Sequence, residues 1–394
     1  MRQLSRVWCV SGISLLLALG VSGCECHRAL CDRAEPVQAV ASVSASAESA
    51  CGASRPASTS SPIGLFGEFP DSESVPFELR ASYSLLQHTD CPEGADFDPA
   101  VDPTGGQLAF ASTRHTRRPD LYIKTVGGAA VTQITSDPAS DIQPEFSPDG
   151  KRLVFSSDRT GNFDIWMIGV DGVGATQLTH EPSHDVRPTW APDGQRIAYC
   201  SLNPKSGQWE LWMLDLRQPG LRKFVGYGLY PRWSPTEDLI AYQRARQRGQ
   251  RWFSIWTLRL VQGEPRFPTE ISASASEAHI LPTFSPDGQK IAFCALCDGG
   301  DAAGGNSGRS EIRVINVDGS EPSRLTGGDD SSFSPCWARD GRVYFASNRG
   351  GKETIWSVRP GDGDSVVTGA AVEPALDRAV TPNRPSATRT VKGR

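Results

Sequence analysis

The sequence predicts an all-β protein, a six-bladed β-propeller built from four-stranded antiparallel blades. One motif recurs six times, successive copies begin 43 to 53 residues apart, and each copy contains four short strand signals separated by turn residues. The 39 Gly and 29 Pro residues suit a fold with many turns. The net charge of -5 gives no basic excess for binding phosphates, so we expect no nucleic-acid partner.

A proline marks each copy of the motif, and in five of the six copies a second proline follows four residues later. The clearest copy begins at Asp141 with the run Asp-Ile-Gln-Pro-Glu-Phe-Ser-Pro-Asp-Gly, and the next begins at Asp185. In the Pro-Asp-Gly turn, proline presets φ and glycine accepts positive φ, so the chain reverses between the first and second strands. The first proline is Pro99, Pro144, Pro188, Pro231, Pro282 or Pro335, and the second is Pro103, Pro148, Pro192, Pro235 or Pro286, with Arg339 in the sixth copy.

The second and third strands of each copy indicate how the blades pack. The second strand is almost wholly apolar, as in Leu-Val-Phe at 153–155, and such short runs indicate strands buried on both faces. Blades stacked around an axis bury both faces of each sheet. The third strand carries an aromatic residue in five copies and Arg313 in the fifth copy of the six, and we interpret the aromatic rings as wedges between blades. These residues are Tyr122, Trp166, Trp212, Trp256 and Trp356.

Two segments compete to supply the outer strand of the last blade. Residues 83–88 precede the first copy and have the character of a strand, and residues 364–368 follow the last copy and have it too. We favour the N-terminal segment, whose pairing would close the ring and remove a sheet edge. Either choice gives six blades.

The first 23 residues have the pattern of an export signal, because two arginines precede an apolar stretch over residues 7–19. The following Val-Ser-Gly-Cys at 21–24 resembles the lipobox of bacterial lipoproteins, in which Cys24 receives a lipid and becomes the new N-terminus. Plain secretion and a single anchor helix are the alternatives, although the apolar stretch is short for a membrane span. Glu25, where an Asp would resemble an inner-membrane retention signal, favours the periplasmic side of the outer membrane.

Four parts of the chain follow from these patterns. We expect a lipoprotein signal peptide at 1–23 and a disordered tether rich in Ala, Ser and Pro at 24–80, because that composition buries too little apolar surface to order itself. The propeller is expected at 81–369, followed by a flexible tail at 370–394.

The run Ser-Pro-Asp-Gly-Lys-Arg-Leu-Val-Phe-Ser-Ser-Asp-Arg-Thr-Gly-Asn-Phe-Asp-Ile-Trp at 147–166 closely resembles the repeats of the TolB propeller family. The resemblance covers residues 83–367 and implies a six-bladed propeller. A typical TolB is a soluble periplasmic protein with an α/β domain ahead of its propeller, a place taken here by the lipobox and tether. The repeats are also similar to the propeller of prolyl oligopeptidase-type peptidases, but we find no Gly-x-Ser-x-Gly elbow for a nucleophile.

Candidate binding residues lie three positions before the first proline, where the chain enters the innermost strand. We expect them to meet at one mouth of the central channel and to bind a cation or a basic residue of a partner. The alternative is that each Asp caps nearby backbone N–H groups in a turn, which needs no ligand. These residues are Asp96, Asp141, Asp185 and His279.

The function we expect is that of a non-enzymatic, exported lipoprotein, a monomer that binds another envelope protein through a propeller face and the membrane through its lipid. We expect no catalytic residue, metal or cofactor. The alternative is a hydrolase-type enzyme, of the lactonase or peptidase-accessory kind, with a metal or active site at the channel mouth. Export permits disulfides, and the N-terminal closure would bring Cys91 and Cys336 near one another at that mouth, where they could pair.

Lipidation at Cys24 is directly testable. The variant Cys24→Ala removes the sulfur that would carry the lipid, so we expect it to lose both metabolic labelling with a radioactive fatty acid and signal-peptide processing. Unchanged processing of the variant, together with an unlabelled and soluble natural protein, would contradict the lipobox interpretation.

Overall fold

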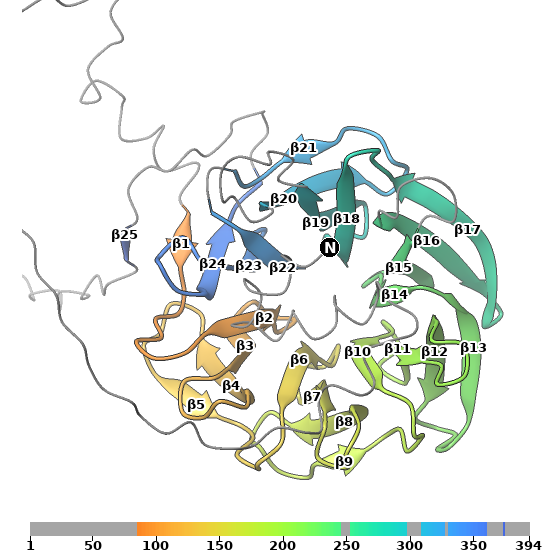
Figure 1. Ribbon diagram of the computed structural model, residues 1–394, viewed down its shortest axis with the longest axis horizontal. Coiled ribbons are helices and arrows are strands. Elements are labelled where there is room, and N and C mark those ends of the chain that lie inside the picture. Colours follow the sequence, from red (N-terminus) through yellow and green to blue (C-terminus); the bar gives the residue numbers. More distant parts are fainter. Residues whose placement is uncertain (1–84, 246–252, 298–308, 328–329, 361–372, 375–394) are drawn as a thin grey trace, which may run out of the picture. The chain divides into compact units, whose positions relative to one another are not determined.

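The structure is a computed structural model that describes residues 85–245, 253–297, 309–327, 330–360 and 373–374. Its strands form six sheets arranged in a ring around a central channel, which confirms the six-bladed all-β propeller (Figure 1). The expected signal peptide, the lipidation site Cys24 and the tether lie outside the described residues. Within the described residues, no helix is long and apolar enough to cross a bilayer.

Each blade is an antiparallel sheet whose first strand lies next to the channel and whose fourth strand lies at the outer rim (Figure 1). Blade 1 contains β2 (Asp96–Val101), β3 (Gln107–Ser112), β4 (Asp120–Thr125) and β5 (Val131–Gln133), and blade 2 contains β6 (Asp141–Phe146), β7 (Arg152–Ser157), β8 (Asp164–Gly169) and β9 (Thr176–Gln177). Blade 3 contains β10 (Asp185–Trp190), β11 (Arg196–Leu202), β12 (Trp209–Asp215) and β13 (Arg222–Tyr227), and blade 4 contains β14 (Leu229–Trp233), β15 (Leu239–Ala245), β16 (Phe253–Val261) and β17 (Glu264–Ser272). Blade 5 contains β18 (Glu277–Phe284), β19 (Lys290–Cys297), β20 (Ser310–Asn316) and β21 (Ser323–Arg324).

Blade 6 is closed by the N-terminal part of the chain. Its first three strands are β22 (Ser332–Trp337), β23 (Val343–Ser347) and β24 (Thr354–Val358), and β1 (Leu86–Gln87) pairs antiparallel with β24. The favoured closure is therefore confirmed, while residues 364–368 lie outside the described residues. The short strand β25 (Glu373–Pro374) pairs parallel with β1 as a fifth strand, so this part of the expected flexible tail covers the edge of the closing strand.

The core lies between blades, as the apolar second strands predict. One cluster joins Leu239 and Ile255 of blade 4 to Ile291 and Phe293 of blade 5. A second cluster joins blades 2 and 3 in the same way. Fully burying one such side chain contributes about 1.5–3 kcal/mol, and an isolated blade would leave these faces in water. Stacking of the blades therefore stabilises each of them.

The aromatic residues of the third strands pack against arginines. Tyr122 and Trp356 are fully buried, and the guanidinium carbons of Arg114 and Arg349 lie 5.0 Å and 5.5 Å from the centres of these two rings. Arg159, Arg222 and Arg244 contact Trp166, Trp212 and Trp256 in the same manner. This arrangement supports the packing interpretation of the aromatic residues, because an arginine of the protein lies over one face of each ring.

A β-bulge with a left-handed residue interrupts every inner strand at the same place. The residue that precedes the first proline has a φ between 49° and 60° in all six blades, and the pairing of the first and second strands shifts register there. A bulge adds one residue to one strand and changes which side chains face a given side. The six residues are Asp98, Gln143, Arg187, Tyr230, Leu281 and Ser334.

Glu353 lies at the seam between the last blade and the first. Its backbone carbonyl accepts a hydrogen bond of 2.9 Å from the N–H of Asp96, and its Oε1 atom is buried without a hydrogen-bond partner among the described residues. Burial, followed by repulsion from Asp98 and Asp96, raises the pKa of Glu353 to about 8. The folded protein therefore holds this proton more tightly than the unfolded chain does.

We expect this carboxyl to make stability depend on pH. The pKa of Glu353 is about 8 in the folded protein, against an ordinary value of 4.5. The contribution of the protonated carboxyl to the free energy of unfolding is therefore fully present below about pH 4.5, and it is lost as the pH rises through about 8. Glu353→Gln cannot ionise, so its melting temperature should rise relative to the natural protein between pH 5 and pH 9. A constant difference between the melting temperatures of the two proteins over this pH range would show that the carboxyl titrates normally.

Candidate functional site

The four predicted mouth residues are buried and engaged within the protein. Both carboxylate oxygens of Asp96 lie 2.9 Å from Nη2 of Arg114, and those of Asp141 lie 3.0 Å and 2.9 Å from Nη2 of Arg159. Both Asp side chains are 0% exposed. Because each carboxylate is matched by an arginine that also stacks on the third-strand ring of its own blade, these residues stabilise the blade.

Asp185 and His279 occupy the equivalent positions, and neither forms an ion pair with an arginine of the described residues. Ser183 donates a hydrogen bond of 3.2 Å to Asp185, and burial raises the pKa of this carboxyl to about 6. His279 Nδ1 lies 2.8 Å from Ser272 Oγ, and burial lowers the pKa of the imidazole. No group of three or more His, Cys, Asp or Glu side chains in the described residues could hold a metal ion. A binding role for the four residues stays a prediction.

The residues that line the middle of the channel lie two positions further along each strand. We call the six left-handed residues the neck: Asp98, Gln143, Arg187, Tyr230, Leu281 and Ser334. Together with the proline that follows each of them and with Arg232, they surround a narrow cavity of about 30 Å³. The bulges therefore direct these side chains to the channel axis.

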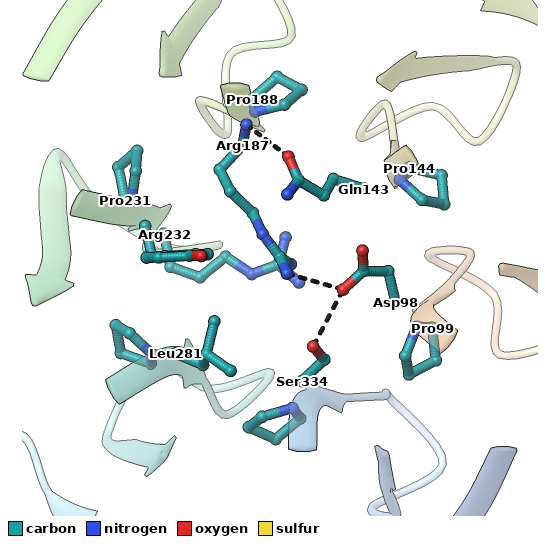
Figure 2. Close-up of a pocket in the computed structure, with 13 residues that line it drawn as sticks. Asp98, Pro99, Gln143, Pro144, Arg187, Pro188, Pro231, Arg232, Leu281 and Ser334 are labelled. Atoms are coloured by element: carbon teal, nitrogen blue, oxygen red, sulfur yellow. Dashed lines mark hydrogen bonds and ion pairs between the residues drawn. The ribbon is translucent and has the colours of Figure 1, made fainter. Parts of the chain in front are cut away.

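An ion pair crosses the neck. Nη2 of Arg187, from blade 3, lies 2.7 Å from Oδ1 of Asp98, from blade 1, and Ser334 of blade 6 donates a hydrogen bond of 2.9 Å to the same oxygen. Figure 2 shows Arg187 extending over the cavity toward these two residues. The backbone N–H of Arg187 also donates a hydrogen bond of 2.9 Å to Oε1 of Gln143. Three blades are therefore joined through one carboxylate, and the channel is narrow at this level.

Beyond the neck the channel widens into a cavity of about 400 Å³, which we call the funnel. It lies toward the ends of the inner strands, at the Pro-Asp-Gly turns, so it opens away from the Asp96 end. This volume falls in the range of small-ligand pockets, about 300–1,000 Å³. All six blades contribute to its lining, which includes Asp102, Glu145, Arg232, Thr283, Cys336, Trp337, Arg339 and the five prolines of the turns.

A second ion pair lies at the inner end of the funnel. Arg232 of blade 4 binds Glu145 of blade 2. The other carboxylate oxygen of Glu145 accepts hydrogen bonds of 3.0 Å from Thr189 Oγ1 and from the backbone N–H of Trp190. Both channel ion pairs therefore connect blades that are two positions apart in the ring, and burial lowers the pKa of Arg232.

The possible disulfide between Cys91 and Cys336 is not formed, and both residues are free thiols. Cys336 lines the funnel near the end of β22. Cys91 precedes the start of β2, and its thiol donates a hydrogen bond of 3.1 Å to the carbonyl of Glu93. The two cysteines lie toward opposite ends of the inner strands, so the N-terminal closure does not bring them together.

Sequence reasoning located the repeating prolines but missed the channel-lining residues beside them. Side chains of a regular strand alternate between its faces, and the bulge breaks that alternation one residue before the proline. The X-Pro pair, present in all six copies, was the available signal. It identifies the channel-lining position once the left-handed φ is known.

The Asp96–Arg114 pair supplies a test of its structural role. Asp96→Asn leaves Arg114, whose side chain is 15% exposed, without a counter-charge, and breaking a buried pair in this way costs about 3 kcal/mol. We expect this loss in the free energy of unfolding measured with urea. Replacing Arg114 with Met in the same variant should recover part of it. A change below about 0.5 kcal/mol, typical of surface positions, would contradict the structural assignment.

Comparison with known proteins gives a consistent result. A family model described as the TolB beta propeller domain matches residues 86–256. An uncharacterized protein of Agrobacterium fabrum is 30% identical over 131 residues, which span 32% of this chain and 36% of that relative, or about a third of its length. A TolB structure from Agrobacterium tumefaciens is 19% identical with a TM-score of 0.52, and the match covers 70% of this chain and 97% of that one.

A TolB structure from Acinetobacter baumannii is 17% identical with a TM-score of 0.48, covering 66% of this chain and 65% of that one. Likeness at these identities concerns the fold alone. Residues 86–256 therefore match the TolB beta propeller domain, and the ring of six blades shows a six-bladed β-propeller similar in fold to these structures.

Proposed function

We propose that this protein is a non-enzymatic binding scaffold of the bacterial cell envelope, and that its funnel receives a segment of another envelope protein. The observation that carries the proposal is the funnel itself, a cavity of about 400 Å³ to which every blade contributes. A propeller similar to the TolB beta propeller domain is compatible with a general role in binding other proteins.

The construction of the ring favours binding by a preformed site. The funnel is lined by strand ends and tight turns whose positions are set by buried cores between the blades. The two ion pairs across the channel add links between blades that do not touch through their sheets. Binding to a rigid site loses little conformational entropy, which favours affinity.

The proposed location follows from the N-terminal sequence. An export signal ending at Cys24 would carry the chain out of the cytoplasm, and a lipid on Cys24 would hold it at a membrane surface. The Ala-, Ser- and Pro-rich residues 24–80 would then act as a tether between membrane and propeller. In this proposal the protein acts as a monomer and needs no cofactor.

Site-specific cross-linking tests the proposed binding face. We would place the photo-reactive amino acid benzoylphenylalanine at Trp337 in the funnel, at the exposed Glu93 in the loop leading to the Asp96 end, or at Val173, which is 68% exposed on the rim of blade 2. We expect one discrete protein adduct from position 337 after irradiation of native envelopes. An excess of soluble, unlabelled propeller should suppress it.

The other two positions separate the alternatives. Adducts from position 93 that position 337 does not give would move the site to the mouth containing Asp96, Asp141 and Asp185. Equal adducts from positions 173 and 337 would mean that no particular face is used, and would contradict the proposal.

A further inference from the structure

The two carboxylates that line the funnel, those of Asp102 and Glu145, already bind groups of the protein itself. The carboxylate of Asp102 accepts hydrogen bonds from the backbone N–H groups of Thr104 and Gln107, at 3.1 Å and 2.6 Å, and from the Thr104 hydroxyl. Glu145 is held by Arg232, Thr189 and Trp190. A cation entering the funnel would have to compete with these donors for both carboxylates.

Donor groups of the funnel remain available. Arg339 is exposed at the rim, and its guanidinium has no hydrogen bond or ion pair with any described residue. The indole N–H of the half-buried Trp337, two residues earlier, likewise has no acceptor in the described part of the chain. Unused donors beside occupied acceptors favour a ligand that brings its own acceptors, above all a carboxylate.

Arg339 is also the exception in the repeat. The five other copies have a proline at this position, and the turn does not depend on the arginine. Ala338 N–H donates to the Arg342 carbonyl at 2.9 Å, and Gly341 N–H donates to the Ala338 carbonyl at 3.0 Å, so the hydrogen bonds of the turn involve neither the side chain nor the N–H of Arg339. The propeller architecture therefore does not explain why an arginine stands at this position.

The apolar part of the lining suits an extended polypeptide. Pro103, Pro148, Pro192, Pro235 and Pro286 surround the funnel together with Trp337. Apolar rings of this kind pack against extended or polyproline-type segments without demanding hydrogen bonds from them. A linear segment is favoured over a folded surface, because the funnel holds only about 400 Å³ and the channel narrows at the neck.

We propose that the funnel selects an extended, acidic peptide segment, whose Asp or Glu carboxylate binds Arg339, and that Arg339 is the specificity-determining residue. This inference rests on the proposed function and names the chemistry of the partner. An acidic ligand for the funnel contrasts with the basic partner expected for the Asp96 end. The carboxylates in both regions are already bound by groups of the protein itself, so neither region favours a basic ligand.

The test uses the exported chain purified with its tether and two peptide pools. Both pools are hexapeptides with random flanks, one with Asp or Glu at the two central positions and the other with Asn or Gln. We expect the immobilised protein to retain the acidic pool at least tenfold more strongly, as quantified by mass spectrometry. Because part of this binding is between exposed charges, retention should fall as salt is raised.

Two variants assign the selectivity. Arg339→Pro installs the residue of the other five copies, so it should leave the melting temperature unchanged while reducing retention of the acidic pool by about tenfold, the effect of losing one charge-assisted hydrogen bond. Lys290→Gln is the matched control, because Lys290 is an exposed cation after the turn of blade 5 that does not line the funnel. It should retain the acidic pool as the natural protein does.

The outcomes separate this inference from the proposed function. Equal retention of both pools above a column without protein would keep the funnel as a peptide site and refute acid selection. Retention of neither pool would contradict the proposed function as well. Equal loss in both variants would mean that surface charge alone attracts the peptides. Stronger binding of an acidic trisaccharide of the same charge would assign the funnel to carbohydrate and refute the peptide proposal.

Discussion

The channel of this propeller depends on one backbone constraint, the left-handed residue that precedes the first proline in every inner strand. Six residues other than glycine hold a φ of 49° to 60° at the same point of the repeat. Such conformations cost roughly 1–3 kcal/mol each and persist where the surrounding structure enforces them. In this propeller the stack of blades holds these residues in place, because each inner strand pairs with a second strand that is buried between neighbouring blades. The bulges in turn decide which side chains reach the axis.

Charge is distributed in two layers with different roles. Within blades, Asp96 and Asp141 are matched by arginines that stack on buried or half-buried rings, so these charges consolidate single blades. Along the channel, Arg187 and Arg232 reach acids two blades away. Such pairs add little net stability because their desolvation offsets the attraction, but breaking one leaves a buried charge. The two ion pairs across the channel therefore favour one arrangement of the blades around the neck.

The two ends of the channel consequently differ in what they offer a partner. At the Asp96 end, the carboxylates are buried and already bonded to the protein. At the funnel end, an apolar wall of prolines surrounds a few polar groups. The guanidinium of Arg339 stands at the rim and binds no other described residue. Loops and turns carried by a rigid scaffold are common sites of function. The asymmetry arises because the repeats are similar in backbone but differ in single side chains.

The sequence alone determined the blade count, the four-strand pattern and the buried second strands, because repeat spacing and local hydrophobicity report directly on sheets that stack. It favoured the N-terminal closure, which the pairing of β1 with β24 decided. It could not identify the channel lining. A strand read by simple alternation places Asp96 and Asp98 on one face, and nothing local reveals the bulge that separates their environments. The ion pair of Arg187 with Asp98 across the neck and the separation of Cys91 from Cys336 involve residues that are distant in sequence. Only the ring of blades decided them, because side chains from different repeats meet there.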